Sequence, residues 1–178
     1  EQNDVGIGYF WTWVDRKQSD RLEEDNGAPS HDFYYLPMQC QHCDNPECVT
    51  VCPTGASVKA ENGTVQIDLD QCIGCQACVS ACPYGVRYLN VEKNVVEKCS
   101  LCADRIEEGE LPQCVLNCVG MAKWFGDLDE GIENFDGPLG KKLGEYVQPY
   151  EEADIHHLAD SGNGPSFVYI LRNHTWQD

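Results

Sequence analysis

Four cysteines in the middle of the chain follow one another at the spacing of metal ligands. The run from Cys72 to Pro83 has the form C-x2-C-x2-C-x3-C-P. Three thiolates at this spacing reach three irons of one [4Fe–4S] cluster, and the fourth, set off by a helical turn and followed by proline, ligates a neighbouring cluster. Gly74 stands where the backbone must curl around inorganic sulfur, which glycine permits without steric cost. The run therefore predicts one cluster and a share in another.

A second version of this run begins at Cys40. It has the form C-x2-C-x4-C-x3-C-P and ends at Pro53, with two extra residues in its middle gap. A gapless alignment that sets Cys52 on Cys82 also sets Val65 on Val95. The sequence after each run is thus repeated as well, which indicates an internal duplication of cluster motif plus hairpin.

Duplicated runs of this kind favour crossed ligation, in which the last cysteine of each run serves the other run's cluster. One cluster is then expected to be bound by Cys40, Cys43, Cys48 and Cys82, and the other by Cys72, Cys75, Cys78 and Cys52. His42 lies between two ligands and is interpreted as a spacer or a hydrogen-bond donor to cluster sulfur, rather than as a ligand.

A third cysteine group follows, with the form C-x2-C-x11-C-x3-C. Its members are Cys99, Cys102, Cys114 and Cys118. The residue after Cys118 is valine, so the proline ending is lost, and the insertion contains a predicted helical turn at 104–109. Structural zinc is the alternative for this group taken alone, because four thiolates also suit that ion.

The cysteine count admits other interpretations of the whole chain. All twelve cysteines lie between Cys40 and Cys118, mostly at gaps of two to four residues. A disulfide scaffold spreads its cysteines to staple loops, and zinc uses two C-x2-C pairs without the third cysteine and the proline. Iron–sulfur ligation is therefore favoured over both.

The charge of the chain excludes some partners. Its formal net charge is −18, whereas nucleic-acid binding and anionic membrane surfaces call for basic patches. The acidity is interpreted as a solvated surface, with docking of a basic partner as the alternative. No apolar run reaches the length of about eighteen residues that a membrane span needs, and no signal peptide is visible, so the sequence leaves the localisation open.

The elements between the cysteines are predicted to be short. Aromatic and β-branched runs predict an N-terminal hairpin of strands at 8–14 and 31–36 with a polar loop at 15–30, in which Trp11, Trp13, Tyr34 and Tyr35 shield clusters and fill a small core. Further strands are expected at 54–58, 64–68, 84–88, 95–96, 122–125 and 167–171, with a short helix at 141–147. The predicted segments are 1–38 (hairpin and loop), 39–98 (two-cluster ferredoxin-like module), 99–128 (third cysteine group) and 129–178 (acidic extension).

Three features together resemble a known family. They are the order of the three cysteine groups, the run Cys82-Pro-Tyr-Gly-Val-Arg-Tyr, and Phe125-Gly-Asp-Leu after the last cysteine. These features are similar to the iron–sulfur, electron-transfer (beta) subunit of molybdopterin oxidoreductases of the DMSO reductase family, over residues 9–128. Among them, the polysulfide and arsenate reductase type has the greater likeness.

The resemblance implies one departure from the family pattern, which has four cysteine groups and four [4Fe–4S] clusters. A first group upstream of Glu1 is missing here. In the family pattern one cluster is bound by Cys99, Cys102, Cys114 and the last cysteine of that first group. Cys118 then binds the cluster that is held by the first three cysteines of the first group. Either the sequence lacks that group as a fragment and the protein has four clusters, or Cys99, Cys102, Cys114 and Cys118 hold a third and last cluster together.

The expected fold is α+β: a ferredoxin-like multi-[4Fe–4S] protein with short β-hairpins and an irregular acidic tail. The expected function is the relay of single electrons through its clusters, with no catalytic residue in the chain itself. The resemblance implies a catalytic partner with a bis-pterin molybdenum or tungsten cofactor, and a quinone-reactive membrane subunit or a soluble carrier as the second partner. It allows an exported, membrane-associated complex or a cytoplasmic one. The alternatives are a free-standing polyferredoxin and a zinc-binding interaction module.

Overall fold

A computed structural model describes residues 3–25, 28–147 and 149–177, with the side chains of 19–25 and 28–32 left undescribed. The chain divides into two compact units. Unit 1 consists of Glu1–Gly6 and Ser100–Tyr150, and unit 2 of Ile7–Cys99 and Glu151–Asp178. Each unit therefore combines segments that are distant in the sequence, and each is described by itself below.

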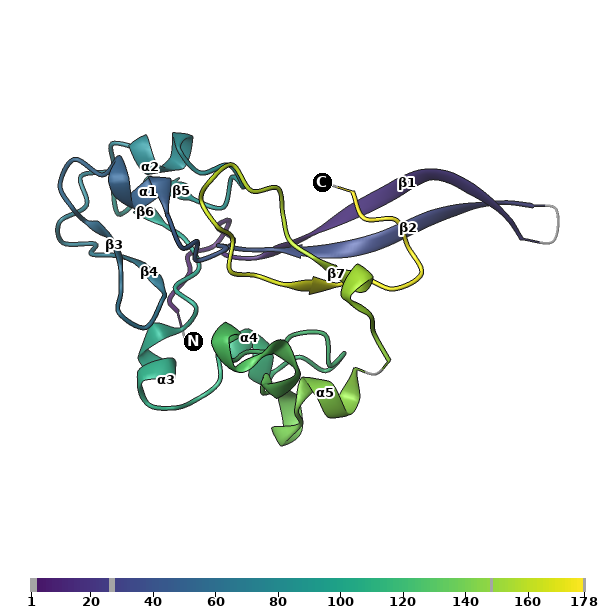
Figure 1. Ribbon diagram of the computed structural model, residues 1–178. Coiled ribbons are helices and arrows are strands. Elements are labelled where there is room, and N and C mark those ends of the chain that lie inside the picture. The colour runs from purple at the N-terminus through teal and green to yellow at the C-terminus, as the bar shows by residue number, and fades with distance from the viewer. Residues whose placement is uncertain (1–2, 26–27, 148, 178) are drawn as a thin grey trace. The chain divides into compact units, whose positions relative to one another are not determined.

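Unit 2 contains an N-terminal hairpin, as predicted, but its first strand begins at Trp13, so only the last two residues of the strand predicted at 8–14 belong to it, and the hairpin is longer than expected. Its strands, β1 (Trp13–Asp25) and β2 (Ala28–Met38), pair antiparallel from Trp13 opposite Met38, with one register shift between Gln18 and Leu22 (Figure 1). The predicted loop at 15–30 is therefore wrong: its residues outside 26–27 form strand. Polarity suggested a loop, but the backbone ladder depends on main-chain groups and tolerates polar side chains in a ribbon that water can reach.

The inner face of β2 contributes to a small apolar core. Tyr34, Leu36 and Met38 are buried together with Leu158, whereas Tyr35, which alternates with them, is 65% exposed. Tyr34 thus fills the core as predicted, and the same prediction is wrong for Tyr35, because successive side chains of a strand point to opposite faces.

Two short hairpins repeat each other in unit 2, as the duplication predicts. β3 (Ser57–Lys59) pairs with β4 (Val65–Ile67), and β5 (Tyr88–Asn90) pairs with β6 (Val95–Glu97). A short helix precedes each hairpin: α1 (Glu47–Thr50) and α2 (Ala77–Ser80). The two helices contact each other.

The segment before β1 holds the second hairpin through aromatic side chains. Tyr9 stacks on Tyr88 with ring centroids 5.0 Å apart, and the indole N–H of Trp11 donates to the Tyr88 hydroxyl at 3.0 Å. That hydroxyl donates to Glu97 at 2.9 Å, which also pairs with Lys93 at 3.1 Å. A continuous polar chain therefore links the N-terminal segment to β6.

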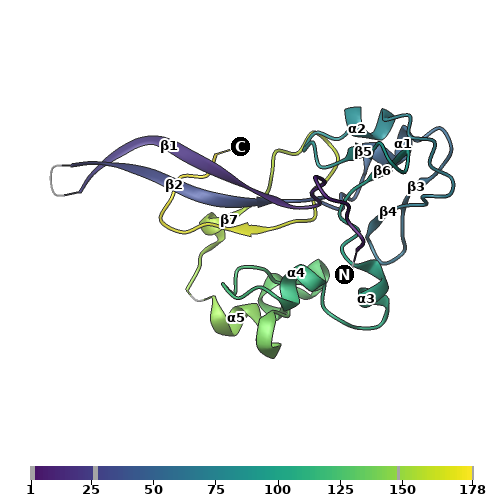
Figure 2. The same cartoon turned by 180° about the vertical axis from the view of Figure 1, so that it is seen from behind.

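The end of the chain returns to unit 2. η4 (Glu152–Asp154) leads into β7 (Ile155–His156), which pairs with β8 (Tyr169–Ile170). This segment runs beside the β1–β2 hairpin in both views (Figures 1 and 2), and Tyr169, Leu171 and Trp176 pack against its core. The predicted strand at 167–171 is confirmed in part, since pairing is limited to two residues.

Unit 1 consists of short helical turns. They are α3 (Ala103–Glu107), α4 (Gln113–Leu116), η1 (Leu128–Glu130), η2 (Ile132–Asn134), η3 (Pro138–Gly140) and α5 (Leu143–Tyr146). The helical predictions at 104–109 and 141–147 are confirmed with shorter bounds. The predicted strand at 122–125 is wrong: among the described residues only Phe125 of this stretch forms a bridge, to Asp136.

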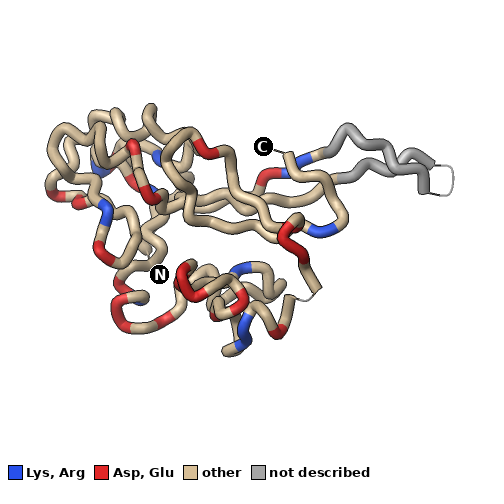
Figure 3. Tube along the Cα trace, viewed as in Figure 1, with Lys and Arg blue, Asp and Glu red and all other residues tan. Residues whose placement is uncertain are grey.

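Figure 3 shows Asp and Glu along many loops of each unit. No helix in the described part of the chain has the length and apolar run that crossing a bilayer requires.

Candidate iron–sulfur sites

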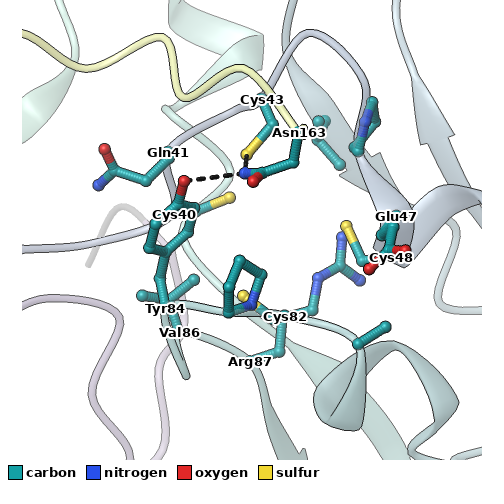
Figure 4. Close-up of a pocket in the computed structure, with 14 residues that line it drawn as sticks. Cys40, Gln41, Cys43, Glu47, Cys48, Cys82, Tyr84, Val86, Arg87 and Asn163 are labelled. Carbon is teal, nitrogen blue, oxygen red and sulfur yellow. Dashed lines mark hydrogen bonds between the residues drawn. The ribbon is translucent and has the colours of Figure 1, made fainter. Parts of the chain in front are cut away.

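Four cysteines predicted to share a cluster surround one cavity in unit 2. Cys40, Cys43, Cys48 and Cys82 line it together with Tyr84 and Arg87, and the space between these walls is about 350 Å³, part of it open to solvent (Figure 4). We call these four cysteines the first site, and Cys52, Cys72, Cys75 and Cys78 the second site. The last cysteine of the second run thus lies with the first three of the first run.

Local backbone geometry delivers the thiols of the first site from separate elements. Cys40 and Cys43 lie in the loop after β2, where His42 between them has a φ of 46°. Cys48 is the second residue of α1, and Cys82 follows α2, with its amide donating to Val79 at 3.4 Å. A left-handed residue turns the chain back between the first two thiols, so that both face one space.

The thiols of the first site lie close enough to disfavour one another's ionisation. Burial raises the pKa of Cys48 to about 11, and the neighbouring thiolates of Cys40, Cys82 and Cys43 also raise it, while Arg87 lowers it. Burial raises the pKa of Cys43 as well, with further contributions from Cys40 and Cys82. All four sulfurs therefore share one electrostatic environment, in which a bound cation is the means of stabilising the thiolate forms.

Arg87 brings a buried positive charge to the cavity wall. Its residue is 3% exposed, and both terminal guanidinium nitrogens are buried without a hydrogen-bond partner among the described residues. The side chain points toward Cys48 (Figure 4). A buried charge without a partner is costly, and the thiolate forms of the cysteines around the cavity would supply the negative charge that compensates it.

Lys98 is a second buried cation near the same thiols. It is 4% exposed, and its ammonium donates to the carbonyl oxygens of Val65 and Cys99. Burial lowers its pKa, while the charges of Cys40, Cys99 and Cys48 raise it. In the part of the chain that the structure describes it pairs with no carboxylate, so its charge also lacks a compensating anion.

His42 is held in place by a backbone hydrogen bond. The amide of Val65 donates to its Nδ1 at 2.9 Å, so the neutral ring carries its proton on Nε2, which is buried without a hydrogen-bond partner among the described residues. Burial lowers the pKa of His42, and the charges of Lys98 and Arg87 lower it further. The ring is therefore a neutral donor, and its role toward sulfur stays a prediction.

The C-terminal segment covers the first site. The side-chain amide of Asn163, 4% exposed, donates to the sulfur of Cys43 at 3.0 Å and to the hydroxyl of Tyr84 at 2.9 Å. The amides of Asp44 and Asn45 donate to Gly164 and Asn163 at 2.8 and 3.0 Å. Backbone and side chain together thus fix this segment on the loop that carries Cys43.

These residues fit a [4Fe–4S] cluster. Four thiols surround the space, as a cubane requires, two buried cations lack carboxylate partners within the described ranges, and a buried amide already donates to one of the sulfurs. No three His, Cys, Asp or Glu side chains of the described residues come together closely enough to hold a single metal ion.

The cysteines of the second site lie after β4 and around the two helices. Cys72 accepts from the amide of Val96 at 3.4 Å, and Cys52 from the amide of Ser57 at 3.4 Å. Burial raises the pKa of Cys52, but the donors of Ser57 and Thr54 more than offset this, so the pKa is lowered. Cys78 is buried and Cys75 is exposed. Their joint ligation of one cluster stays a prediction.

The third cysteine group repeats the backbone geometry of the other two. The residue two positions after the first cysteine is left-handed in each group: His42, Gly74 and Leu101 have φ of 46°, 66° and 58°. The third cysteine of each group is the second residue of a short helix, α1, α2 or α4.

The end of each group is repeated as well. The residue three positions after the last cysteine has a positive φ (Gly55, Gly85 and Met121), and its amide donates back to that cysteine's carbonyl at 3.3, 3.3 and 3.0 Å. Met121 adopts the conformation that glycine adopts in the other groups, although the sequence there has lost the C-P signature. The third group is thus built on the same backbone plan.

The members of the third group belong to different units. Cys99 lies in unit 2, buried with Cys40 and Val86. The other three lie in unit 1, where burial raises the pKa of Cys114 and Cys102 contributes to this. The sulfur of Cys118 accepts from the amide of Ala122 at 3.2 Å. All twelve cysteines are free of disulfides.

Three residues beside the first site were not predicted from the sequence: Arg87, Lys98 and Asn163. The duplication contained a signal for the first two, because the gapless alignment sets Arg87 on Ser57 and Lys98 on Asp68. A charge that only one copy of a repeat carries is not needed for the fold that the two copies share, and so indicates a role of that copy alone. Asn163 lies 120 residues beyond Cys43, and no sequence pattern pointed to it.

Comparisons with known proteins identify the family. The model of the 4Fe–4S dicluster domain matches residues 31–128. A protein of Halobacterium salinarum, named as an iron–sulfur subunit of dimethyl sulfoxide reductase, is 35% identical, over 96% of this chain and 70% of its own length. The thiosulfate reductase electron transfer subunit of Salmonella typhi is 51% identical, over 72% of this chain and 65% of its own length.

A subunit of the sulfite dehydrogenase of Allochromatium vinosum is 47% identical, over 83% of this chain and 60% of its own length. The chain thus spans less than two thirds of two of these three relatives. The likeness to the polysulfide and arsenate type stays a prediction. The chain belongs to the 4Fe–4S dicluster family, among the iron–sulfur subunits of DMSO reductase-family molybdopterin oxidoreductases.

Proposed function

We propose that this chain relays single electrons through [4Fe–4S] clusters and performs no bond chemistry of its own. The observation that carries the proposal is the first site, where four thiols and the buried guanidinium of Arg87, which has no hydrogen-bond partner among the described residues, line one cavity. When bound, a [4Fe–4S] cluster accepts and gives up one electron at a time. The residues of the chain supply the ligands, the burial and the local charge that set its potential.

The chain is proposed to fold as an α+β protein in which crossed ligation joins the two runs. The first site supports this arrangement, because Cys82 comes from the second run and its partners come from the first. The third group is proposed to bind a cluster too, which the repeated backbone turns after Cys52, Cys82 and Cys118 support. Iron per chain distinguishes three clusters from four.

The proposed partners follow from the relatives. Two are named as subunits of a dimethyl sulfoxide reductase and a thiosulfate reductase, and by this likeness we infer a molybdopterin subunit, with molybdenum or tungsten, as the catalytic partner. A quinone-reactive membrane subunit or a soluble carrier completes the relay. A free-standing polyferredoxin lacks support from the comparisons, because these relatives are named as subunits.

The test is metal analysis of the full chain, purified without oxygen. We expect iron and acid-labile sulfide in equal amounts, a broad visible absorbance that dithionite bleaches, and an EPR signal from the reduced protein. Affinity purification from the native host is expected to bring down a subunit that contains molybdenum or tungsten. Zinc in place of iron, or iron without labile sulfide, would contradict the proposal.

A further inference from the structure

The two halves of the duplicated module differ in charge, although their backbones correspond. Arg87 lines the cavity of the first site with both terminal nitrogens buried, and the ammonium of Lys98 donates to the carbonyl oxygen of Val65, a residue that lines the same cavity. Both cations are almost fully shielded from solvent, being 3% and 4% exposed. The first site is therefore flanked by two positive charges in a medium that screens them weakly.

The corresponding positions in the other half carry no cation. Arg87 corresponds to Ser57, which is buried and neutral. Lys98 corresponds to Asp68, an exposed carboxylate whose pKa is lowered first by the side-chain amide of Gln71. The duplication thus has two buried cations in one copy and a neutral residue and an anion in the other.

Hydrogen bonds to sulfur occur in both sites and offset part of this difference, because the amides of Val96 and Ser57 donate to Cys72 and Cys52 of the second site at 3.4 Å. The amide of Asn163 donates to Cys43 at 3.0 Å in the first site. This donor comes from the C-terminal segment, which lies outside the duplication and so has no counterpart in the second run. The carboxylate of Glu47 also lines the cavity, but it is exposed, and solvent and salt screen its charge more than those of the buried cations.

An electron added to a cluster makes it more negative by one charge. Positive charge and hydrogen-bond donors near the sulfurs stabilise this reduced state and raise the reduction potential. Solvent raises the potential of the second site instead, since its Cys75 is exposed and water also stabilises added charge. Two buried charges in a low dielectric outweigh the exposure of one thiol and the two amide bonds of 3.4 Å to second-site sulfurs.

We propose that the first site has the higher reduction potential of the two sites in the duplicated module, and that Arg87 is a residue that sets it. This inference rests on the proposed function. In a partly reduced protein the electron then resides at the Cys40, Cys43, Cys48 and Cys82 end of the module. The charge difference between the two copies thereby favours electron transfer from the second site to the first.

The test is an EPR-monitored redox titration of the full chain, with the signals assigned through Cys48→Ser and Cys78→Ser. The signal that Cys48→Ser alters should appear first as the potential is lowered. In Arg87→Gln, at the wild-type midpoint, its ratio of reduced to oxidised form should fall about tenfold, which is ~59 mV for one electron. Arg87→Lys keeps the charge and should restore most of the potential.

Lys141→Gln removes an exposed lysine in unit 1 and is the matched control for net charge, with no shift expected. If Arg87→Gln fails to retain iron in the first site, Asp68→Lys tests instead whether a positive charge in this module raises the potential of the nearby cluster. This exposed substitution should raise the midpoint of the second-site signal, and more so at low salt.

Two results would overturn the inference: the Cys78-dependent signal appearing at the higher potential, or an unchanged first-site midpoint in Arg87→Gln with its iron retained. Iron and sulfide are measured in every variant. A wild-type chain without iron refutes the proposed function, whereas a chain with iron and an unshifted midpoint refutes only the role of Arg87.

Discussion

Asn163 is expected to hold the C-terminal segment over the first site, and Asn163→Leu tests this. The side chain is buried, and its amide donates to Cys43 and Tyr84 at 3.0 and 2.9 Å. Its oxygen accepts from Ser161, which is exposed and can bond to water instead. The loss is therefore dominated by the two amide bonds, each worth about 0.5–1.5 kcal/mol net.

Their loss should destabilise the closed segment by about 1–3 kcal/mol, which is roughly a 5- to 150-fold increase in its opening equilibrium. The assay is hydrogen exchange of the Asp44 and Asn45 amides, because these donate to Gly164 and Asn163 of the segment. Exchange at both amides should accelerate by that factor when the segment recloses faster than an open amide exchanges, because the exchange rate then reports the opening equilibrium.

Asn134→Leu is the matched control, since Asn134 is an exposed asparagine of unit 1 whose amide donates to a backbone carbonyl. It should leave exchange at Asp44 and Asn45 unchanged. Equal protection of these two amides in wild type and Asn163→Leu would refute the reasoning, because it would mean that the backbone bonds alone hold the segment.

Other predictions concern thiol reactivity, backbone strain and pH. In the apoprotein, Cys52 should be alkylated faster than Cys48 near neutral pH, because its pKa is lowered while that of Cys48 is raised to about 11; mass spectrometry of the labelled peptides measures both, and equal rates would contradict it. Gly74→Ala should lose iron to a chelator faster than wild type, because its φ is 66° and an added Cβ would lie 2.6 Å from the carbonyl oxygen of Asn94; Gly55→Ala, with a positive φ but open space, separates the clash from the strain, and equal losses would assign the effect to strain. Burial raises the pKa of Glu97, but hydrogen bonds from Lys93, Tyr88 and Asn90 more than offset this, so the pKa is lowered from its ordinary value of 4.5. Its contribution to stability is thus present above that ordinary value and lost as the pH falls through the lower pKa of the folded state; thermal melts of Glu97→Gln should lack this component, and an unchanged acid profile would count against it.

Much of the arrangement could be predicted because cysteine spacing is a local property with a narrow range of geometries. The duplication indicated the paired hairpins, β3–β4 and β5–β6, and the set of Cys40, Cys43, Cys48 and Cys82, which line one cavity in the structure. The ligands of the second and third clusters stay predictions.

What the sequence did not reveal depends on contacts between distant segments. The loop predicted at 15–30 is largely strand because each strand supplies its partner's hydrogen bonds, a property that side-chain polarity does not report. Asn163 reaches Cys43 only because the chain returns to the module after unit 1. Arg87 belongs to a recognisable sequence motif, but nothing in the sequence indicates that it is buried, because its burial depends on how the cavity closes.

The most direct test of crossed ligation is cluster content in Cys82→Ala compared with Cys78→Ala. Both cysteines belong to the second run, but Cys82 lies with Cys40, Cys43 and Cys48 around the cavity. We predict that Cys82→Ala removes or alters the EPR signal that Cys48→Ser affects, and that Cys78→Ala affects a different one. If both alanine variants instead alter the same signal, and Cys48→Ser leaves it intact, the chain does not ligate its clusters by crossing between the runs.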